Sequence, residues 1–170
     1  MWKFRGQKRP DFALPPAPGQ ESVWDYPRPP ELVPDGRRVE VFYGDQLVAL
    51  SSSVFRVLET ASPPSFYIPP QDVNRELLTS APGNSMCEWK GAAKYWGLAS
   101  NPAMGIVGWS YPDPAPAFEP IRDFISFYPA LLACYVSGER VSAQPGQFYG
   151  GWITNEIVGP FKGEVGTAHW

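Results

Sequence analysis

Length, composition and charge narrow the class of protein. The chain has 170 residues, of which 44% are hydrophobic and 15% aromatic, and its formal net charge is −3. This acidic balance excludes a strongly electrostatic nucleic-acid binder, which needs a basic surface, and no stretch approaches the ~20 apolar residues that span a membrane. We therefore expect one domain with a buried core, no nucleic-acid partner and no membrane contact.

The few cysteine and histidine residues limit metal chemistry. The sequence holds Cys87, Cys134 and a single histidine, His169. A structural zinc takes about four Cys or His ligands, so we predict no metal site, and we expect no cofactor. Two cysteines do not suggest a disulfide-stabilised secreted protein, and the basic N-terminus lacks the apolar segment of a signal peptide. These features favour a cytoplasmic protein.

Residues 1–34 are predicted to form a proline-rich arm. They contain eight of the 21 prolines, which excludes a helix or an interior strand. Five aromatic residues nevertheless occur there: Trp2, Phe4, Phe12, Trp24 and Tyr26. These rings predict that the arm docks on its own domain or on a neighbouring subunit, so a homodimer through the arm or the C-terminal tail is one alternative.

Residues 35–137 are predicted to form a β-rich core domain. Alternating apolar residues at 37–42 and 47–50 flank Gly44-Asp45, which indicates a hairpin. Further strands are expected at 54–59, 66–68 and 105–111, with a one-turn helix at 71–77 and a loop at 81–85.

One amphipathic helix is expected at the end of this domain. Apolar residues recur at spacings of three and four between Ile121 and Tyr135, Pro120 suits a first turn and Gly138 closes the segment. Pro129 should kink or split this helix. Residues 138–170 are rich in Gly and Pro and are predicted to pack on the core as a tail. The fold class is therefore mainly β (α+β), compact and antiparallel.

Several motifs resemble the domain of unknown function 427 family. They extend over about residues 37–136, in order and with fitting spacings, and comprise Arg37-Arg38-Val39, Val57-Leu58-Glu59-Thr60, Pro63-Pro64, Phe66-Tyr67-Ile68-Pro69, Asp72-Val73, Cys87-Glu88-Trp89-Lys90-Gly91, Tyr95-Trp96 and Trp109-Ser110-Tyr111-Pro112. The tail resembles a branch common in cyanobacteria and other bacteria.

The resemblance implies a fold related to the β-tent, a group that includes type B methionine sulfoxide reductase and the drug-binding domain of cereblon. Members of that group often carry a four-Cys zinc site, which two cysteines cannot form. The reductase pattern is also missing. Some family labels suggest a nucleotidyltransferase, but the chain has no paired Asp or Gly-Ser pattern of that chemistry. The resemblance therefore implies a fold and a site without a reaction.

The segment Cys87–Trp96 is the strongest candidate site. Lys90 is suited to an anionic ligand, and Trp89 and Trp96 to stacking on a planar ring. Three roles are open for Cys87. It is expected to be an activated thiolate beside Lys90, a thiol that lines a pocket, or an inert core thiol. A nucleophilic Cys also needs a base, for which His169 is the only histidine. Gly91 indicates close backbone approach, a positive φ or a bulge.

Other candidate residues lie on the neighbouring strands. Arg56 and Glu59 point to opposite faces unless the strand bends, and Glu59 is either a general base, a ligand contact or part of an ion pair. Tyr67, Tyr95 and Trp109 either line a ligand cavity or fill the core. Phe161-Lys162-Gly163 is loosely similar to Trp89-Lys90-Gly91, which we interpret as coincidence or as two similar turns.

Three functions follow in order of preference. The first is binding of a small aromatic, nucleotide-like or modified-amino-acid ligand in an aromatic pocket around Trp89-Lys90-Gly91. The second is an enzyme that uses Glu59, Tyr67, Cys87 and Lys90, with Glu59 and Cys87 as the catalytic candidates. The third is a protein-interaction module built from the arm and the tail.

Overall fold

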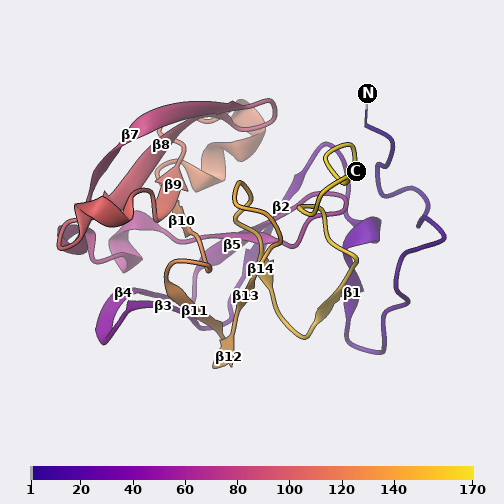
Figure 1. Cartoon of the computed structure of the whole chain (residues 1–170), viewed down its shortest axis with the longest axis horizontal. Coiled ribbons are helices and arrows are strands. Elements are labelled where there is room, and N and C mark those ends of the chain that lie inside the picture. Colours follow the sequence, from indigo (N-terminus) through magenta and orange to yellow (C-terminus); the bar gives the residue numbers. More distant parts are fainter. Residues whose placement is uncertain (1) are drawn as a thin grey trace.

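The computed structural model describes residues 2–170 and is mainly β and antiparallel, as the sequence predicts (Figure 1). Every helical segment in this range is a short 3-10 helix. They are η1 (Val23–Asp25), η2 (Pro70–Asp72), η3 (Arg75–Leu77), η4 (Pro102–Met104) and η5 (Pro116–Ile121). None of the helices within residues 2–170 has the length and apolar character needed to cross a membrane.

Three sheets form the body of the molecule. The first sheet has the order β10 (Ile125–Phe127), β9 (Gly108–Ser110), β8 (Gly91–Leu98) and β7 (Leu78–Cys87). The second sheet has the order β12 (Glu139–Arg140), β11 (Ala133–Val136), β3 (Val39–Tyr43) and β4 (Gln46–Ser51). The third sheet has the order β2 (Glu31–Asp35), β5 (Val54–Leu58) and β6 (Ser65–Tyr67). All neighbours in these sheets run antiparallel.

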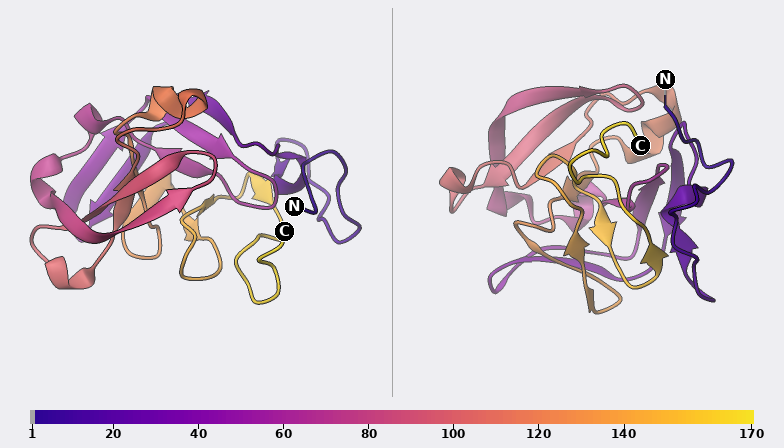
Figure 2. Two further views of the ribbon diagram at one scale, coloured as in Figure 1. Left: turned by 90° about the horizontal axis from the view of Figure 1, so that it is seen from above. Right: turned by 45° about the vertical axis from the view of Figure 1, so that its right-hand side comes forward.

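Two pairs of short strands attach the ends of the chain. β13 (Ser142–Ala143) pairs antiparallel with β14 (Trp152–Ile153), and β1 (Glu21–Ser22) pairs parallel with β15 (Ile157–Val158). The β1–β15 pair joins the proline-rich arm to the C-terminal tail. Figure 2 shows the arm in indigo and the tail in yellow on the same side of the molecule, with the two marked chain ends near each other.

The predicted hairpin around Gly44-Asp45 is confirmed. β3 and β4 pair from Val39–Ser51 to Tyr43–Gln46, and Gly44 has a φ of 57° in the turn. Pro34 lies in β2, which is an edge strand of its sheet. An edge strand tolerates proline because its outer side needs no N–H donor.

The main core lies between the two four-stranded sheets. Figure 1 shows the β7–β8 hairpin along the upper side and the β3–β4 hairpin along the lower side. Apolar side chains from both sheets are fully buried between them, among them Val39, Leu98 and Phe127, together with Ile68 after β6 and Trp152 of β14. Trp152 stacks on Phe66 with ring centroids 4.8 Å apart, and its Nε1 donates to the Phe127 carbonyl oxygen at 2.9 Å. The tail thus contributes a central core residue.

The amphipathic helix expected between Pro120 and Gly138 is wrong. η5 ends at Ile121, and the following residues form β10 and β11 with a turn between them. Asp123 has a φ of 63°, which no helix tolerates, and Pro129 removes an N–H that a helix needs. The apolar residues that pack in the main core, Ile125 and Phe127 and then Leu132, Cys134 and Val136, are spaced two apart. That period belongs to strands.

Two smaller expectations are also corrected. Residues 81–85, expected as a loop, lie within β7, where the register between Ala81 and Ser85 shifts against β8. Gly83 has a φ of 114° in this irregularity. A bulge of this kind needs an extra residue and often a glycine, so the Pro-Gly pair marks a bulge rather than a loop. The one-turn helix expected at 71–77 is instead the two 3-10 turns η2 and η3.

The arm docks on its own chain through a terminal aromatic cluster, which consists of Phe4, Phe12, Trp24 and Trp170. Phe12 stacks on Trp170 with centroids 5.1 Å apart, and Trp24 meets the other three rings edge-on at 5.1–5.2 Å. Trp24 Nε1 donates to the Pro160 carbonyl oxygen at 3.1 Å. Of the two docking modes expected for the arm, this is the one within the chain.

Candidate functional site

A cavity of about 250 Å³ opens where the β7–β8 hairpin, β6, β9 and the tail meet. We call it the aromatic cavity. Its aromatic lining comes from separate parts of the chain: Tyr67, Tyr95, Trp109, Tyr111, Tyr128, Phe148 and Tyr149. Polar groups between the rings belong to Glu59, Ser62, Ser65, Ser85, Lys90, Gln144 and Lys162. The cavity therefore combines ring surfaces with hydrogen-bonding and charged groups.

The structure brings together six of the eight predicted site residues. Those six line the aromatic cavity: Glu59, Tyr67, Cys87, Lys90, Tyr95 and Trp109. The other two do not line it. Trp89 packs against the aromatic side chains behind the cavity, and its Nε1 is buried without a hydrogen-bond partner within residues 2–170. Arg56 lies on the other side of β5 in an ion-pair network.

The segment Cys87–Trp96 contains the turn of the β7–β8 hairpin and most of β8. β7 ends at Cys87, residues 88–90 turn, and Gly91 pairs with Cys87 at the start of β8. Gly91 has a φ of 111°, and a Cβ there would lie 3.2 Å from the Asp113 carbonyl oxygen. The positive φ and the close backbone approach expected of this glycine are both present. The tight turn directs Lys90 to the cavity.

Lys90 is buried and has no ionic partner. Its exposed fraction is 8%, and its Nζ lies 5.9 Å from the ring centroid of Tyr111 and 5.8 Å from that of Phe118. No side chain within residues 2–170 makes a hydrogen bond or ion pair with this ammonium group. The Nζ atom keeps contact with the open cavity, and the faces of the two rings flank it there.

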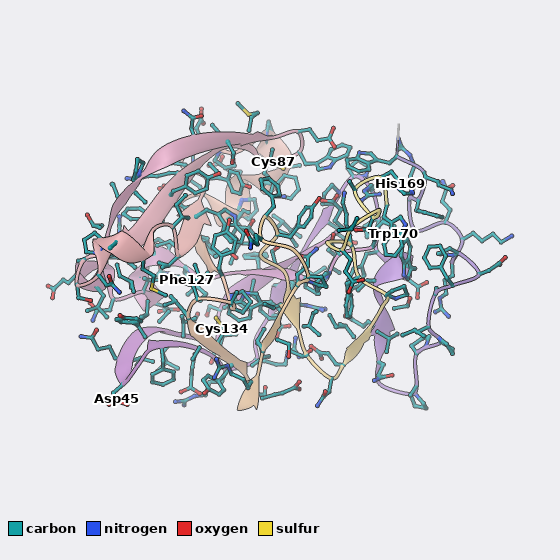
Figure 3. All side chains as sticks on the ribbon, in the orientation of Figure 1. Asp45, Cys87, Phe127, Cys134, His169 and Trp170 are labelled. Carbon is teal, nitrogen blue, oxygen red and sulfur yellow. The ribbon has the colours of Figure 1, made fainter. Side chains whose placement is uncertain are left out.

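Cys87 lines the cavity as a free, half-buried thiol, whereas Cys134 is buried in the main core. Figure 3 shows the two cysteines in different parts of the molecule, with His169 in the tail. His169 is exposed and does not line the cavity. Burial raises the pKa of the Cys134 thiol, which keeps that group protonated. No histidine base therefore stands beside Cys87.

The tyrosine and tryptophan rings form a connected wall. Trp109 Nε1 donates to the Tyr67 hydroxyl at 3.0 Å, and the ring centroids of Tyr67 lie 6.2 Å from Trp109 and 6.3 Å from Tyr111. Burial raises the pKa of both Tyr67 and Tyr111. Their hydroxyls thus stay protonated at neutral pH.

Arg56 and Glu59 belong to two different ion-pair networks. Arg56 donates to both carboxylate oxygens of Glu21, at 2.7 and 3.2 Å, and lies 3.3 Å from Asp35. The Glu59 carboxylate accepts from Arg28 Nε at 3.2 Å. Arg28 also donates to three carbonyl oxygens, those of Phe4, Thr60 and Trp170, and its side chain is fully buried. Arg56 thus belongs to a structural ion-pair network away from the cavity. The Glu59 carboxylate, by contrast, is paired with Arg28 and also lines the cavity.

The tail supplies the lining residues that sequence reasoning missed. Lys162 lines the cavity with an exposed fraction of 5%, and burial, together with Arg28, lowers the pKa of its ammonium group. Gln144 donates to the Lys162 carbonyl oxygen at 2.7 Å and accepts from the Gly151 N–H at 3.0 Å. The similarity of Phe161-Lys162-Gly163 to Trp89-Lys90-Gly91 is the sequence feature that could have indicated Lys162 as a lining residue.

A glycine pair lets the tail reach this position. A Cβ on Gly150 would lie 2.3 Å from Trp109 Cη2, and one on Gly151 would lie 2.5 Å from Gln144 Oε1. These distances are far below van der Waals contact, so only glycine allows the backbone to pass so close to the ring wall. The Gly-Gly sequence is thus a packing requirement of the cavity.

Among residues 2–170, no group of three or more His, Cys, Asp or Glu side chains is placed to hold a metal ion.

Comparison with known proteins identifies one family. The curated proteins gave no match to this chain. The family described as Domain of unknown function (DUF427) matches residues 31–139, which is more than half of the chain and contains β2 to β11. The kinship with the β-tent group and with the cyanobacterial branch stays a prediction. The chain belongs to the DUF427 family.

Proposed function

We propose that this protein binds a small molecule with a planar ring in the aromatic cavity. The supporting observation is that rings from β6, β9 and the tail border an open volume of about 250 Å³ instead of filling it with one another. Ligand sites typically combine apolar and aromatic walls with a few placed polar groups. The tyrosine hydroxyls, Gln144 and Lys90 are such groups here.

The cavity volume limits the size of the ligand. Sites for drug-sized ligands usually enclose about 300–1,000 Å³, and the aromatic cavity lies just below that range. A ligand with one ring and one or two polar substituents suits this volume. Such a ligand places its ring against the aromatic wall and hydrogen-bonds to the polar groups.

A second candidate function is catalysis at the same place. Glu59, Tyr67, Cys87 and Lys90, the four residues expected to act in an enzyme, all line the aromatic cavity. One contact and one missing partner argue against their activation. The Glu59 carboxylate is hydrogen-bonded to Arg28, and Cys87 has no histidine beside it. Binding is therefore preferred over catalysis.

The interaction module ranks third. The rings of the arm pack on one another and on Trp170 of the same chain, which leaves fewer of them for a partner. A homodimer through other parts of the arm or tail belongs to this third proposal. A cytoplasmic location is also proposed, and the two free thiols support it.

A matched pair of substitutions on β8 tests the binding proposal. Ala93 lines the cavity, whereas its neighbour Ala92 is exposed and points away from it. Benzamide and a panel of neutral single-ring fragments are titrated into the wild type, Ala93→Phe and Ala92→Phe by protein-observed NMR. We expect millimolar or better binding to the wild type and Ala92→Phe, and none to Ala93→Phe. If no fragment shifts resonances of the cavity residues in the wild type, the proposal fails.

The alkylation rate of Cys87 separates binding from catalysis. An activated thiolate reacts with iodoacetamide much faster than free cysteine at pH 7, because the thiolate is the nucleophile. The binding proposal expects Cys87 to react no faster than free cysteine, with buried Cys134 as an unreactive internal reference. A rate more than about tenfold above free cysteine would favour the catalytic alternative, since it corresponds to a strongly lowered thiol pKa.

A further inference from the structure

We infer that the ligand of the aromatic cavity is an anion, a ring compound whose phosphate or carboxylate group lies against Lys90 and Lys162. This inference rests on the proposed function and assigns its ligand class. It follows from a count of the charged groups around the cavity and from the partners that each of them has.

The cavity carries an excess of positive charge. Three charged side chains line it, namely Lys90, Lys162 and Glu59. Arg28 stands behind Glu59 and donates to its carboxylate at 3.2 Å, while Glu88 accepts from Trp2 Nε1 at 2.9 Å outside the cavity. Among the lining side chains, two ammonium groups thus stand against one carboxylate, and Arg28 already holds that carboxylate. Among the lining residues alone, both cations lack an ion-pair partner within residues 2–170.

Lys90 presents the stronger requirement for a counter-charge. Its side chain is more than nine-tenths buried, it lines the cavity, and its ammonium group is flanked by the rings of Tyr111 and Phe118. The Nζ atom still reaches the open cavity, so an anion bound there replaces water with a charged acceptor. A phosphate or carboxylate oxygen in the cavity supplies the acceptor that the described chain does not.

Lys162 presents a weaker but similar requirement. Its Nζ donates to the Trp170 carbonyl oxygen at 3.4 Å, which is long for a hydrogen bond, and lies 4.4 Å from the ring centroid of Trp2. Burial and the nearby Arg28 lower the pKa of this group. A bound anion favours the charged form of Lys162, so anion binding and protonation of this group support each other.

Neutral donors complete the site. The hydroxyls of Tyr67 and Tyr111 stay protonated because burial raises the pKa of each. Ser62 and Ser65 also line the cavity. Hydroxyl donors and ammonium groups together match an oxyanion with several acceptor oxygens, and the ring wall matches the remainder of the ligand. The sole lining carboxylate, Glu59, is already held by Arg28 and repels such an anion less than a free carboxylate would.

The test compares charged and neutral ligands of one size. Phenyl phosphate, benzoate, benzamide and inorganic phosphate are titrated by isothermal calorimetry into the wild type, Lys90→Gln, Lys90→Arg and Lys94→Gln. Lys94 is the matched control, because it lies on the same hairpin but is exposed and does not line the cavity. Folding of each variant is checked by NMR, and Lys90→Arg keeps the charge if Lys90→Gln does not fold.

The expected result is a dependence on charge at Lys90. Phenyl phosphate or benzoate binds the wild type at least tenfold more tightly than benzamide does, and Lys90→Gln weakens it by about 10- to 100-fold, the usual loss for a hydrogen bond to a charged group. Lys90→Arg stays within tenfold of the wild type and Lys94→Gln within twofold. Preference for phenyl phosphate over benzoate, or the reverse, identifies the acidic group.

Two results overturn the inference in distinguishable ways. If benzamide binds as tightly as the two acids, or if Lys90→Gln leaves acid binding unchanged, the anion inference fails while the proposed function stands. If neither the acids nor the neutral fragments bind, both fail together. Binding of inorganic phosphate with the same Lys90 dependence supports the anion site directly, because no ring contributes to it.

Discussion

Two regions of this molecule gather aromatic side chains against a backbone rich in Gly and Pro: the terminal aromatic cluster and the aromatic cavity. In the terminal cluster, Phe4, Phe12, Trp24 and Trp170 fill the space between them, with ring centroids 5.1–6.0 Å apart. In the aromatic cavity, the rings stand around about 250 Å³ of open volume. Aromatic content is therefore not what distinguishes a binding site from a core.

The two regions differ in how their polar groups are satisfied. In the terminal cluster, Trp24 Nε1 donates to a carbonyl oxygen, and the guanidinium of Arg28 beneath it meets one carboxylate and three carbonyl oxygens. In the cavity, the ammonium group of Lys90 has no such partner within residues 2–170. The ammonium group of Lys90 is therefore free to pair with a group that enters the cavity from outside the chain.

The largest effect is expected from emptying the terminal cluster. Trp24 is 1% exposed and contacts the other three rings. Trp24→Ala should lower the free energy of unfolding by about 3–5 kcal/mol, the usual cost of removing a buried Trp side chain. Phe148→Ala, at the exposed mouth of the cavity, should stay within about 0.5 kcal/mol. Urea unfolding followed by circular dichroism measures both. A cost below about 1 kcal/mol for Trp24→Ala would mean that the arm is not docked in solution.

A smaller effect is expected from adding one methyl group to the tail. In Gly150→Ala the new Cβ would lie 2.3 Å from Trp109 Cη2, so the tail or the ring has to move. Overpacking of this kind costs about 1–3 kcal/mol, and the movement should also weaken ligand binding. Gly36→Ala is the control, because the nearest atom to its Cβ is the Ser52 carbonyl oxygen at 4.0 Å. Equal thermal stability of the two variants would contradict the close packing of tail and cavity.

A pH-dependent effect is expected where the arm is tied to β5. Hydrogen bonds from Arg56 lower the pKa of Glu21 despite partial burial. A lowered carboxyl pKa contributes stability above the unfolded value, and this contribution is lost as the pH falls through the folded value. Glu21→Gln should therefore cost about 0.5–1 kcal/mol at pH 7, discounted because the carboxylate is partly exposed, and almost nothing at pH 3.

The comparison for Glu21 is the exposed residue Glu31 on the neighbouring strand β2. Glu31→Gln should change stability by less than about 0.5 kcal/mol at either pH, as surface substitutions usually do. Urea unfolding of both variants at pH 3, 5 and 7 gives the profile. A loss for Glu21→Gln that stays constant down to pH 3 would rule out the ion pair as its cause.

The smallest effect is expected at Lys90 and has the opposite sign. Lys90→Met keeps an apolar stem against Tyr111 and Phe118 and removes the unpaired charge. We expect stability to be unchanged or higher by up to about 1 kcal/mol, because functional groups are often held at a cost in stability. Lys94→Met, at an exposed position, should have no effect. Differential scanning calorimetry resolves the difference, and a loss above about 1 kcal/mol would make Lys90 a structural residue.

The sequence by itself determined those elements that a pattern of a few neighbouring residues specifies. Gly44-Asp45 between alternating runs gave the β3–β4 hairpin, and Gly91 after Lys90 gave a positive φ at a tight approach. Six of the residues expected in the site line one cavity. Turn chemistry and alternation act over a few residues, and a single segment carries them in full.

The helix expected after Pro120 shows where local patterns mislead. Apolar spacings of three and four between Ile121 and Tyr135 also accommodate two short strands, since Ile125 and Phe127 lie two apart. Strand pairing with β9 and β3 decided between the two periods. Pairing partners lie far away in the sequence, so a window of a dozen residues does not contain the deciding contact.

Only the tertiary structure decided which charges share the cavity. Lys162 and Gln144 reach it because Gly150 and Gly151 let the tail pass against Trp109 and Gln144. Arg56 leaves the candidate site because Glu21 and Asp35 bind it on the other side of β5. Spacing along the chain specifies the face on which a side chain lies, whereas the partner it meets depends on long-range packing between segments that local sequence does not encode.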